Sequence, residues 1–154
     1  MKFPNKPKKS LGQNFLIDQN IIQKIIAIGN IKNNKTVLEI GSGYGHLTKK
    51  IANLKPKKIY AIEKDKNLAY LLKNDLTESK NIEIINDDIF NFFKRKILKK
   101  DVIVFGNLPY NISTKVLTYL VMLEIWPPWY DNLILMFQKE VADRIITTNK
   151  SKTF

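Results

Sequence analysis

The sequence predicts an α/β fold in which helices cover both faces of a mostly parallel sheet. Five short apolar runs rich in β-branched residues alternate with segments of helical periodicity. Strands that are joined through helices in this way pair in parallel. A glycine-rich turn also joins the first run directly to a helix, which permits a tight change of direction. The expected strands are residues 36–40, 58–63, 81–86, 101–104 and 132–137.

Composition limits the kind of protein and the chemistry. A chain of 154 residues makes one domain, and its net charge of +12 favours a polyanionic partner such as nucleic acid. The alternative is a solubilising surface, since most of the basic residues are lysine. Without cysteine and with one histidine, His46, the chain offers no disulfide, thiolate nucleophile or zinc–thiolate site, and no metal is predicted. The absence of a long apolar run makes a cytoplasmic location the expectation.

The first thirty residues contain a basic arm and a helix. Residues 2–9 hold lysines and two prolines, which prevent a helix, so this arm either tracks phosphates or is a disordered tail. The next helix is expected over residues 18–28, with Asp18 as N-cap and Gly29 just after its end. Its apolar face is expected to contain Ile21, Ile22, Ile25, Ile26 and Ile28.

The first strand, residues 36–40, leads into Gly41-Ser42-Gly43-Tyr44-Gly45 and then a helix over residues 44–54. These glycines allow a ligand to approach the backbone closely. The spacing is G-x-G-x-G rather than the dinucleotide pattern, so no diphosphate is required, and a nucleoside with an amino-acid tail would fit. His46 is interpreted as a residue on the surface of this helix.

Acidic residues end the next two strands. Glu63 ends the second strand, where a carboxylate can accept both ribose hydroxyls of a nucleoside cofactor. A helix over residues 64–76 follows, with Leu68, Leu71 and Leu72 expected to face inward. After the third strand, Asp88 can accept from an adenine amino group while the backbone of Ile89 faces the ring. Asp87 and Asp88 could instead form a simple turn. The nearby aromatic residues Phe90, Phe92 and Phe93 are expected in the core.

The fourth strand precedes the segment Phe105-Gly106-Asn107-Leu108-Pro109-Tyr110. Pro109 cannot donate to a sheet ladder, so Asn107 to Tyr110 are expected on a loop at the carboxyl end of the strand, where α/β sheets bind ligands. Ser113 is expected to cap a helix over residues 114–125. Further along, Trp126 and Trp129 are expected to be packing residues, and a final helix is expected from residue 138.

Such a loop suits methylation of an exocyclic amine on a base. The side-chain oxygen of Asn107 and the carbonyl of Leu108 can accept from the two N–H groups, which favours a pyramidal, nucleophilic nitrogen. Pro109 would stiffen the carbonyl, and Tyr110 would stack on the base. The alternative is an ordinary turn that ends a strand, because Asn, Pro and Tyr are common in loops.

Four blocks in order resemble the small-subunit ribosomal RNA adenine dimethyltransferases, the KsgA family. The blocks are Leu11-Gly12-Gln13-Asn14-Phe15-Leu16, Val37-Leu38-Glu39-Ile40-Gly41-Ser42-Gly43-Tyr44-Gly45, Gly106-Asn107-Leu108-Pro109-Tyr110-Asn111-Ile112-Ser113 and Gln138-Lys139-Glu140-Val141-Ala142-Asp143-Arg144. The resemblance implies a class I S-adenosylmethionine-dependent methyltransferase fold, which is Rossmann-like. It also implies dimethylation of N6 on two adjacent adenosines near the 3′ end of small-subunit ribosomal RNA, in ribosome biogenesis.

The resemblance also implies roles for individual residues. Catalytic roles in the target-amine site fall on Asn107, Leu108, Pro109 and Tyr110. S-adenosyl-L-methionine would be bound by Gln13, Asn14 and Leu16 as a cover, Gly41 and Gly43 at the methionine part, Glu63 at the ribose, Asp88 and Ile89 at the adenine, and Asn107 beside them.

Compared with that family, the sequence ends where a sixth strand is expected. The last strands and the helical C-terminal domain are therefore expected to be missing. Residues 1–17 are interpreted as a basic arm and cofactor-covering segment, and residues 18–154 as an incomplete Rossmann-like domain. The expected partner is small-subunit ribosomal RNA or the immature small subunit, and the expected oligomeric state is a monomer. Two alternatives stay open: a large-subunit ribosomal RNA adenine methyltransferase of the antibiotic-resistance type, and a non-catalytic RNA-binding assembly factor on the same fold.

Overall fold

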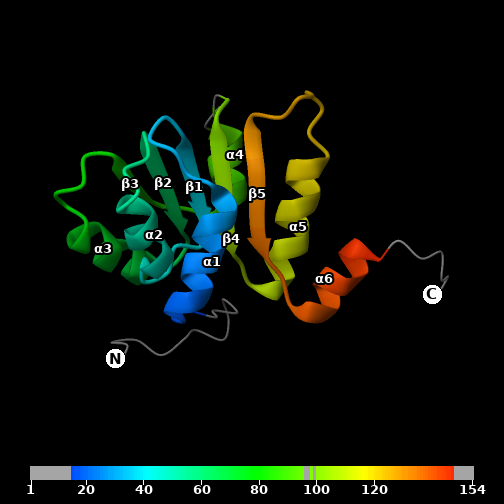
Figure 1. Cartoon of the computed structure of the whole chain (residues 1–154), viewed down its shortest axis with the longest axis horizontal. Helices are drawn as coiled ribbons and strands as arrows, with labels where there is room; N and C mark the ends of the chain where they lie inside the picture. The colour runs from blue at the N-terminus through cyan, green and yellow to red at the C-terminus, as the bar shows by residue number, and fades with distance from the viewer. Residues whose placement is uncertain (1–14, 96–97, 99, 148–154) are drawn as a thin grey trace.

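The computed structural model describes residues 15–95, 98 and 100–147, which form a five-stranded parallel sheet with helices on both faces (Figure 1). The strand order is β3-β2-β1-β4-β5, and every neighbouring pair is parallel. This confirms the predicted α/β fold. The elements are α1 (Gln19–Gly29), β1 (Thr36–Ile40), α2 (His46–Ala52), β2 (Lys58–Glu63), α3 (Lys66–Asp75), β3 (Ile82–Asn86), α4 (Ile89–Arg95), β4 (Val102–Asn107), α5 (Tyr110–Val121), β5 (Tyr130–Met136) and α6 (Lys139–Ile146).

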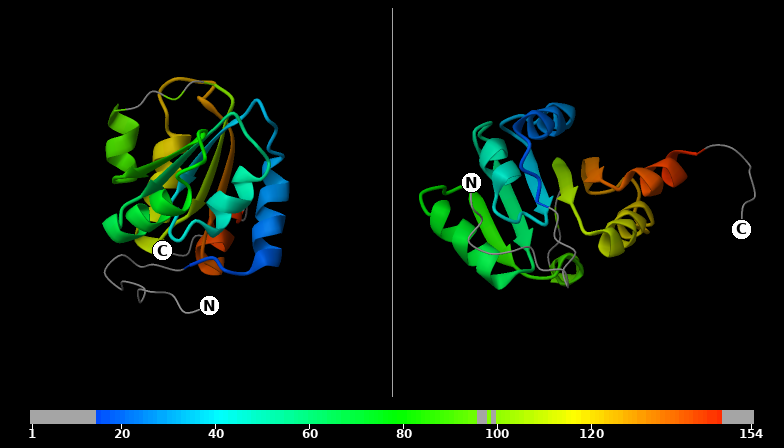
Figure 2. Two further views of the ribbon diagram at one scale, coloured as in Figure 1. Left: turned by 90° about the vertical axis from the view of Figure 1, so that its left-hand side faces the viewer. Right: turned by 90° about the horizontal axis from the view of Figure 1, so that it is seen from below.

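Each face of the sheet has its own hydrophobic core. On one face, Ile22 of α1 and Ile51 of α2 are fully buried in a cluster with Phe105 of β4. On the other face, Phe92 of α4 and Val116 of α5 belong to a second buried cluster. Figure 2 shows α1 in blue and α5 in yellow on opposite sides of the sheet. Alternate residues of the central strands β1 and β4 therefore pack in different cores, so a shift by one residue would exchange their buried faces.

Helix α1 begins as predicted and ends differently. Asp18 is the N-cap, and its Oδ1 accepts from the backbone N–H groups of Asn20 and Ile21 at 2.8 and 3.1 Å. Gly29 is the last helical residue rather than the residue after the helix, and Asn30 takes the left-handed conformation instead. The predicted apolar face is too wide, since Ile28 is 68% exposed. Ile21 is also exposed, while Ile25 is buried.

Gly29 is required for close packing. A Cβ atom on this residue would lie 2.4 Å from Cζ of Phe105, a side chain with no solvent exposure. We expect Gly29→Ala to destabilise the fold by about 1–3 kcal/mol, the usual cost of overpacking a filled core. Urea denaturation measures the change. Adding Phe105→Leu should reduce the cost of the alanine, because it removes the ring atom that the methyl group meets. If Gly29→Ala lowered the free energy of unfolding equally in the wild type and in the Phe105→Leu variant, this explanation would be contradicted.

The boundary between β4 and α5 differs from the prediction. β4 continues to Asn107, which pairs with Met136 of β5, so Asn107 ends the strand rather than lying on a loop. α5 begins at Tyr110 with Pro109 in the N-cap position. Ser113 is therefore inside the first turn and buried, and the prediction that it caps the helix is wrong. The fixed φ angle of proline already suits the start of a helix, which removes the need for a serine cap.

The aromatic residues were mostly interpreted correctly. Phe92 is buried, and Phe90 and Phe93 pack against the same core, as predicted. Trp129 also packs there, with its ring 5.3 Å from that of Tyr130. Trp126 is 73% exposed, so its interpretation as a packing residue is wrong. Leu71 of α3 is likewise exposed, whereas Leu68 and Leu72 are buried as predicted.

Candidate functional site

The glycine turn lies at the carboxyl end of β1, in the middle of the sheet. Gly41, Gly43 and Gly45 all have positive φ angles, of 78°, 54° and 76°. The first of these conformations allows the N–H groups of Gly41 and Ser42 to donate to the carbonyl of Ile62 on β2, at 2.8 and 3.2 Å. Helix α2 begins only after Gly45, two residues later than predicted, because left-handed residues cannot start a helix. His46 is consequently its first residue and is partly buried.

The side chain of Glu63, at the end of β2, is hydrogen-bonded to this turn. Its Oε2 accepts from the N–H of Gly43 and its Oε1 from the N–H of Asp65, both at 2.8 Å. The residue is only 7% exposed, and burial raises the pKa of its carboxyl group although these two N–H groups oppose the shift. A carboxylate has about four acceptor positions. Glu63 therefore keeps acceptor capacity for a ligand while its position is fixed.

Asp88 follows β3 at the same edge of the sheet. Its Oδ1 accepts from the N–H of Phe90 at 2.9 Å, and its Oδ2 accepts from Nζ of Lys64 at 3.0 Å. Burial acts to raise the pKa of Asp88, but the bonds from Lys64 and Phe90 outweigh it and lower the pKa overall. The side chain of Ile89 is buried in the core, which leaves only its backbone at this edge.

The segment after β4 touches the glycine turn. A Cβ atom on Gly41 would lie 3.1 Å from the carbonyl oxygen of Asn107 and 3.6 Å from Cδ2 of Leu108. Asn107, Leu108 and Pro109 are each partly buried. The structure therefore brings together two of the predicted groups of site residues. One is the glycine turn after β1, and the other is the segment at the end of β4. Tyr110 begins α5, and its side chain lies outside what the structure describes.

The covering segment is described only from Phe15 onward, so Gln13 and Asn14 lie outside the described residues. Phe15 lies over the glycine turn: its Cδ1 is 3.3 Å from the Cβ position of Gly43, and its ring is 4.8 Å from that of Tyr44. Leu16 packs against the hydrophobic cluster beneath α1. The described start of this segment thus lies where a cover of the turn is expected.

Sequence reasoning assigned no role to three polar residues beside the turn. Asp65 is buried, caps α3 and donates its N–H to Glu63. Lys64 pairs with Asp88. Glu39 is 2% exposed, and burial raises the pKa of its carboxyl group to about 8. Thr48 lies close enough to oppose this shift, although Oε2 of Glu39 has no hydrogen-bond partner of normal geometry among the described residues.

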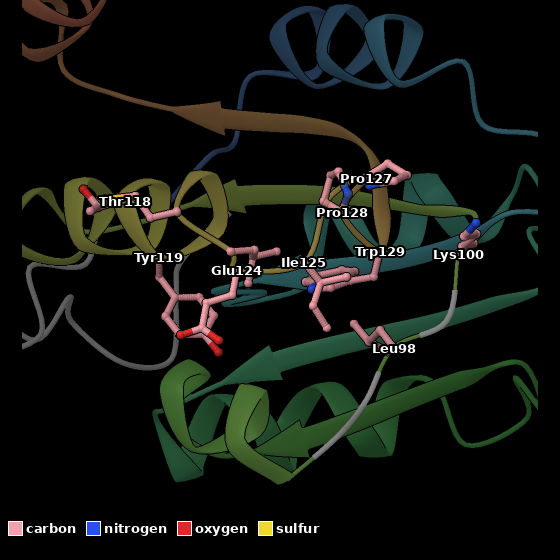
Figure 3. Close-up of a pocket in the computed structure, with 11 residues that line it drawn as sticks. Leu98, Lys100, Thr118, Tyr119, Glu124, Ile125, Pro127, Pro128 and Trp129 are labelled. Carbon is pink, nitrogen blue, oxygen red and sulfur yellow. The ribbon is translucent and has the colours of Figure 1, made fainter.

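A separate pocket of about 850 Å³ lies at the opposite edge of the sheet. It is lined by residues before β4, at the end of α5 and before β5, including Leu98, Tyr119 and Trp129 (Figure 3). None of the predicted site residues lines it. The candidate site is instead the edge formed by the carboxyl ends of β1, β2, β3 and β4.

This sheet, with its glycine turn and an acid at the end of the second strand, defines the fold of the S-adenosylmethionine-dependent methyltransferases. A crystal structure of a dimethyladenosine transferase from Plasmodium falciparum is similar over 88% of this chain and 47% of its own, with a TM-score of 0.74 and 31% identity. The crystal structure of the 23S rRNA methyltransferase ErmE is similar over 84% of this chain and 50% of its own, with a TM-score of 0.73 and 27% identity.

The chain belongs to the ribosomal RNA adenine dimethylase family, whose sequence pattern matches residues 4–153. A curated relative from Pelagibacter ubique, named ribosomal RNA small subunit methyltransferase A, is 54% identical over 142 residues. That match covers 92% of this chain and 53% of the relative. A relative of the same name from Wolbachia pipientis wMel is 42% identical, over 99% of this chain and 53% of its own. The chain thus spans about half the length of these relatives.

Proposed function

We propose that this chain forms the cofactor-binding and catalytic part of an enzyme that dimethylates N6 of two adjacent adenosines near the 3′ end of small-subunit ribosomal RNA. The contact between the glycine turn and the segment from Asn107 carries this proposal, because it would set the cofactor beside the target amine. The family and the names of its curated relatives support the same substrate. The activity would take place in the cytoplasm, during ribosome biogenesis.

The residues around the turn fit S-adenosyl-L-methionine. Because Gly41 and Gly43 have no side chains, the turn packs closely against Asn107 and Phe15, and its backbone would contact the methionine part. Glu63 retains acceptor positions for the ribose hydroxyls, and Asp88 with the backbone of Ile89 would bind the adenine. Gln13, Asn14 and Leu16 would cover the cofactor. When bound, the cofactor supplies a methyl group on a sulfonium, which leaves as a neutral thioether.

The chain's own residues would orient the target amine. The side-chain oxygen of Asn107 and the carbonyl of Leu108 would accept from its two N–H groups, and Pro109 would hold that carbonyl in place. Tyr110 would stack on the base. Because the leaving group departs neutral, positioning is the main task and no strongly basic side chain is needed. His46, at the start of α2, has no part in this scheme.

The partner would be ribosomal RNA or the immature small subunit, to which a net charge of +12 is suited. Residues 1–17 would form the basic arm and cofactor cover, and residues 18–154 the methyltransferase domain, acting as a monomer. Among the residues that the structure describes, no helix is long and apolar enough to cross a membrane. The similarity to ErmE keeps the large subunit as a second candidate, but the higher identity to small-subunit relatives favours the small subunit.

Binding of the cofactor tests the first half of the proposal. We expect the chain to bind S-adenosylmethionine saturably in a calorimeter. Glu63→Ala should weaken binding roughly thirtyfold, since losing a carboxylate bonded to two hydroxyls costs on the order of 2 kcal/mol.

Two controls make this measurement specific. Glu78→Ala removes an exposed glutamate on the same part of the chain and should leave the affinity unchanged. Thermal melting shows whether the Glu63 variant is folded, because Glu63 also braces the turn through Gly43. Failure of the folded wild-type chain to bind would contradict the proposed cofactor. Equal binding by the wild type and the Glu63 variant would contradict the role of Glu63.

A further inference from the structure

Lys64 and Asp88 form a bridge between the ends of two strands. Lys64 follows the last residue of β2, and Asp88 lies two residues after the end of β3. The two strands are neighbours in the sheet and run in parallel (Figure 1). Both residues therefore lie at the candidate site. Nζ of Lys64 lies 3.0 Å from Oδ2 of Asp88. The ion pair thus connects the end of β2, next to Glu63, with the segment that follows β3.

The backbone around this bridge is held in place from both sides. The side-chain amide of Asn86 donates to the carbonyls of Glu63 and Lys64, at 2.9 and 3.1 Å. On the other side, the N–H of Phe90 fixes Oδ1 of Asp88 at 2.9 Å. Among the described residues, each oxygen of the Asp88 carboxylate therefore has a donor, and the orientation of the carboxylate is determined from both sides.

This arrangement leaves acceptor capacity on Asp88. A carboxylate has about four acceptor positions, of which Phe90 and Lys64 occupy two. An amine donor can bind Asp88 without displacing Lys64. The side chain of Asp88 is 28% exposed and that of Lys64 is 56% exposed, so a ligand can reach the pair. Lys94 of α4 is a second cation that acts on Asp88.

We propose that Lys64 is a positioning residue for the purine end of the cofactor site, and that it acts by holding Asp88 as the acceptor for an exocyclic amine. The inference rests on the proposed function, because it assigns the cofactor's adenine to Asp88. It makes Lys64 a determinant of base specificity. A purine with a carbonyl oxygen in place of the amine has no exocyclic N–H to donate to Asp88, so it loses the hydrogen bond that this pair orients.

The test compares two ligands by calorimetry. One is S-adenosylhomocysteine, and the other is its hypoxanthine analogue, which has a carbonyl oxygen in place of the amine. Lys64→Met keeps an unbranched side chain and removes the charge. It should weaken binding of the adenine ligand about three- to fivefold, the effect expected from one partly exposed pair. Binding of the hypoxanthine ligand should not change.

Two further variants show whether the effect passes through Asp88. In an Asp88→Asn background, Lys64→Met should no longer change the affinity for the adenine ligand. Lys66→Met removes the same charge from an exposed residue at the start of α3 and should leave both ligands unaffected. Thermal melting confirms that each variant is folded.

The outcomes separate this inference from the proposed function. Binding of the adenine ligand that is unchanged in Lys64→Met overturns the role of Lys64 and leaves the proposed function intact. Equal weakening of both ligands shows that Lys64 does not act through Asp88 and also overturns the inference. If the folded wild-type chain binds neither ligand, the proposed cofactor is wrong and the inference fails with it.

Discussion

Asn107→Ala is expected to lower the rate of methyl transfer about a hundred- to a thousandfold, the usual cost of removing one group that stabilises a transition state. The side-chain amide oxygen would be lost from the target amine, and the nitrogen would keep its planar, weakly nucleophilic form. Incorporation of labelled methyl groups from S-adenosylmethionine into small-subunit ribosomal RNA measures the rate.

The same variant should still bind the cofactor with nearly wild-type affinity. The carbonyl oxygen of Asn107, not its side chain, lies against Gly41, and alanine retains that carbonyl. Asn132→Ala, at an exposed asparagine of β5, provides a control that should keep full activity. Full methyl transfer by Asn107→Ala would contradict its catalytic role. Rescue of ribosome assembly in cells by an inactive Asn107→Ala protein would favour the non-catalytic assembly factor.

Glu39→Gln is expected to make the folded protein more stable than the wild type above pH 8. Burial raises the pKa of Glu39 from 4.5 to about 8, so the folded chain binds a proton that the unfolded chain releases. The stability that Glu39 contributes is complete below pH 4.5 and is lost as the pH rises toward 8. The total loss is roughly 5 kcal/mol, at about 1.4 kcal/mol for each pH unit. Glutamine stays neutral and avoids this loss.

Urea denaturation of both proteins between pH 5 and pH 9 tests this expectation, and the quantity to follow is the difference in their free energies of unfolding. The pKa of Glu63 is also raised, and the pKa values of Asp88 and Asp101 are lowered, but these groups occur in both proteins and their contributions cancel. Glu78→Gln, the same change at an exposed site, should follow the wild type at every pH. A constant difference between wild type and Glu39→Gln would contradict a protonated Glu39.

Local patterns in the sequence predicted most of the fold. Asp18 starts α1, and the β-branched runs form strands, through interactions with residues close in sequence. These elements can therefore be predicted from local sequence patterns. The limits of β1 and β2 agree with the prediction residue for residue. The start of α5 could not be predicted from Ser113, because Pro109 competes for the same role and begins the helix earlier. The exposure of Trp126 and Ile28 depends on which elements lie above them, which no local pattern contains.

The candidate site was predictable to the level of strand ends. Glu63 and Asn107 end β2 and β4, and Asp88 follows β3. All strands of the sheet run parallel, so the convergence of these residues on one edge follows from the topology. The contacts that fix these side chains come from polar residues that belong to no recognisable motif. Lys64 gives no signal in the sequence, because its pairing with Asp88 depends on the spacing of β2 and β3. Glu39 lies two residues before Gly41, but its burial depends on the packing of α2 and gives no signal in the sequence. The roles of Gln13, Asn14, Leu16, Leu108, Pro109 and Tyr110 stay predictions.

The contact between Gly41 and the carbonyl of Asn107 has a consequence for the comparison of related sequences. One side of the contact is a missing side chain and the other is a backbone atom. No change of side chain at position 107 can make room for a larger residue at position 41, because the carbonyl is present in every amino acid. We therefore expect the two positions to vary independently among relatives. Methods that detect contacts from correlated substitutions will not find the place where the two halves of the site meet.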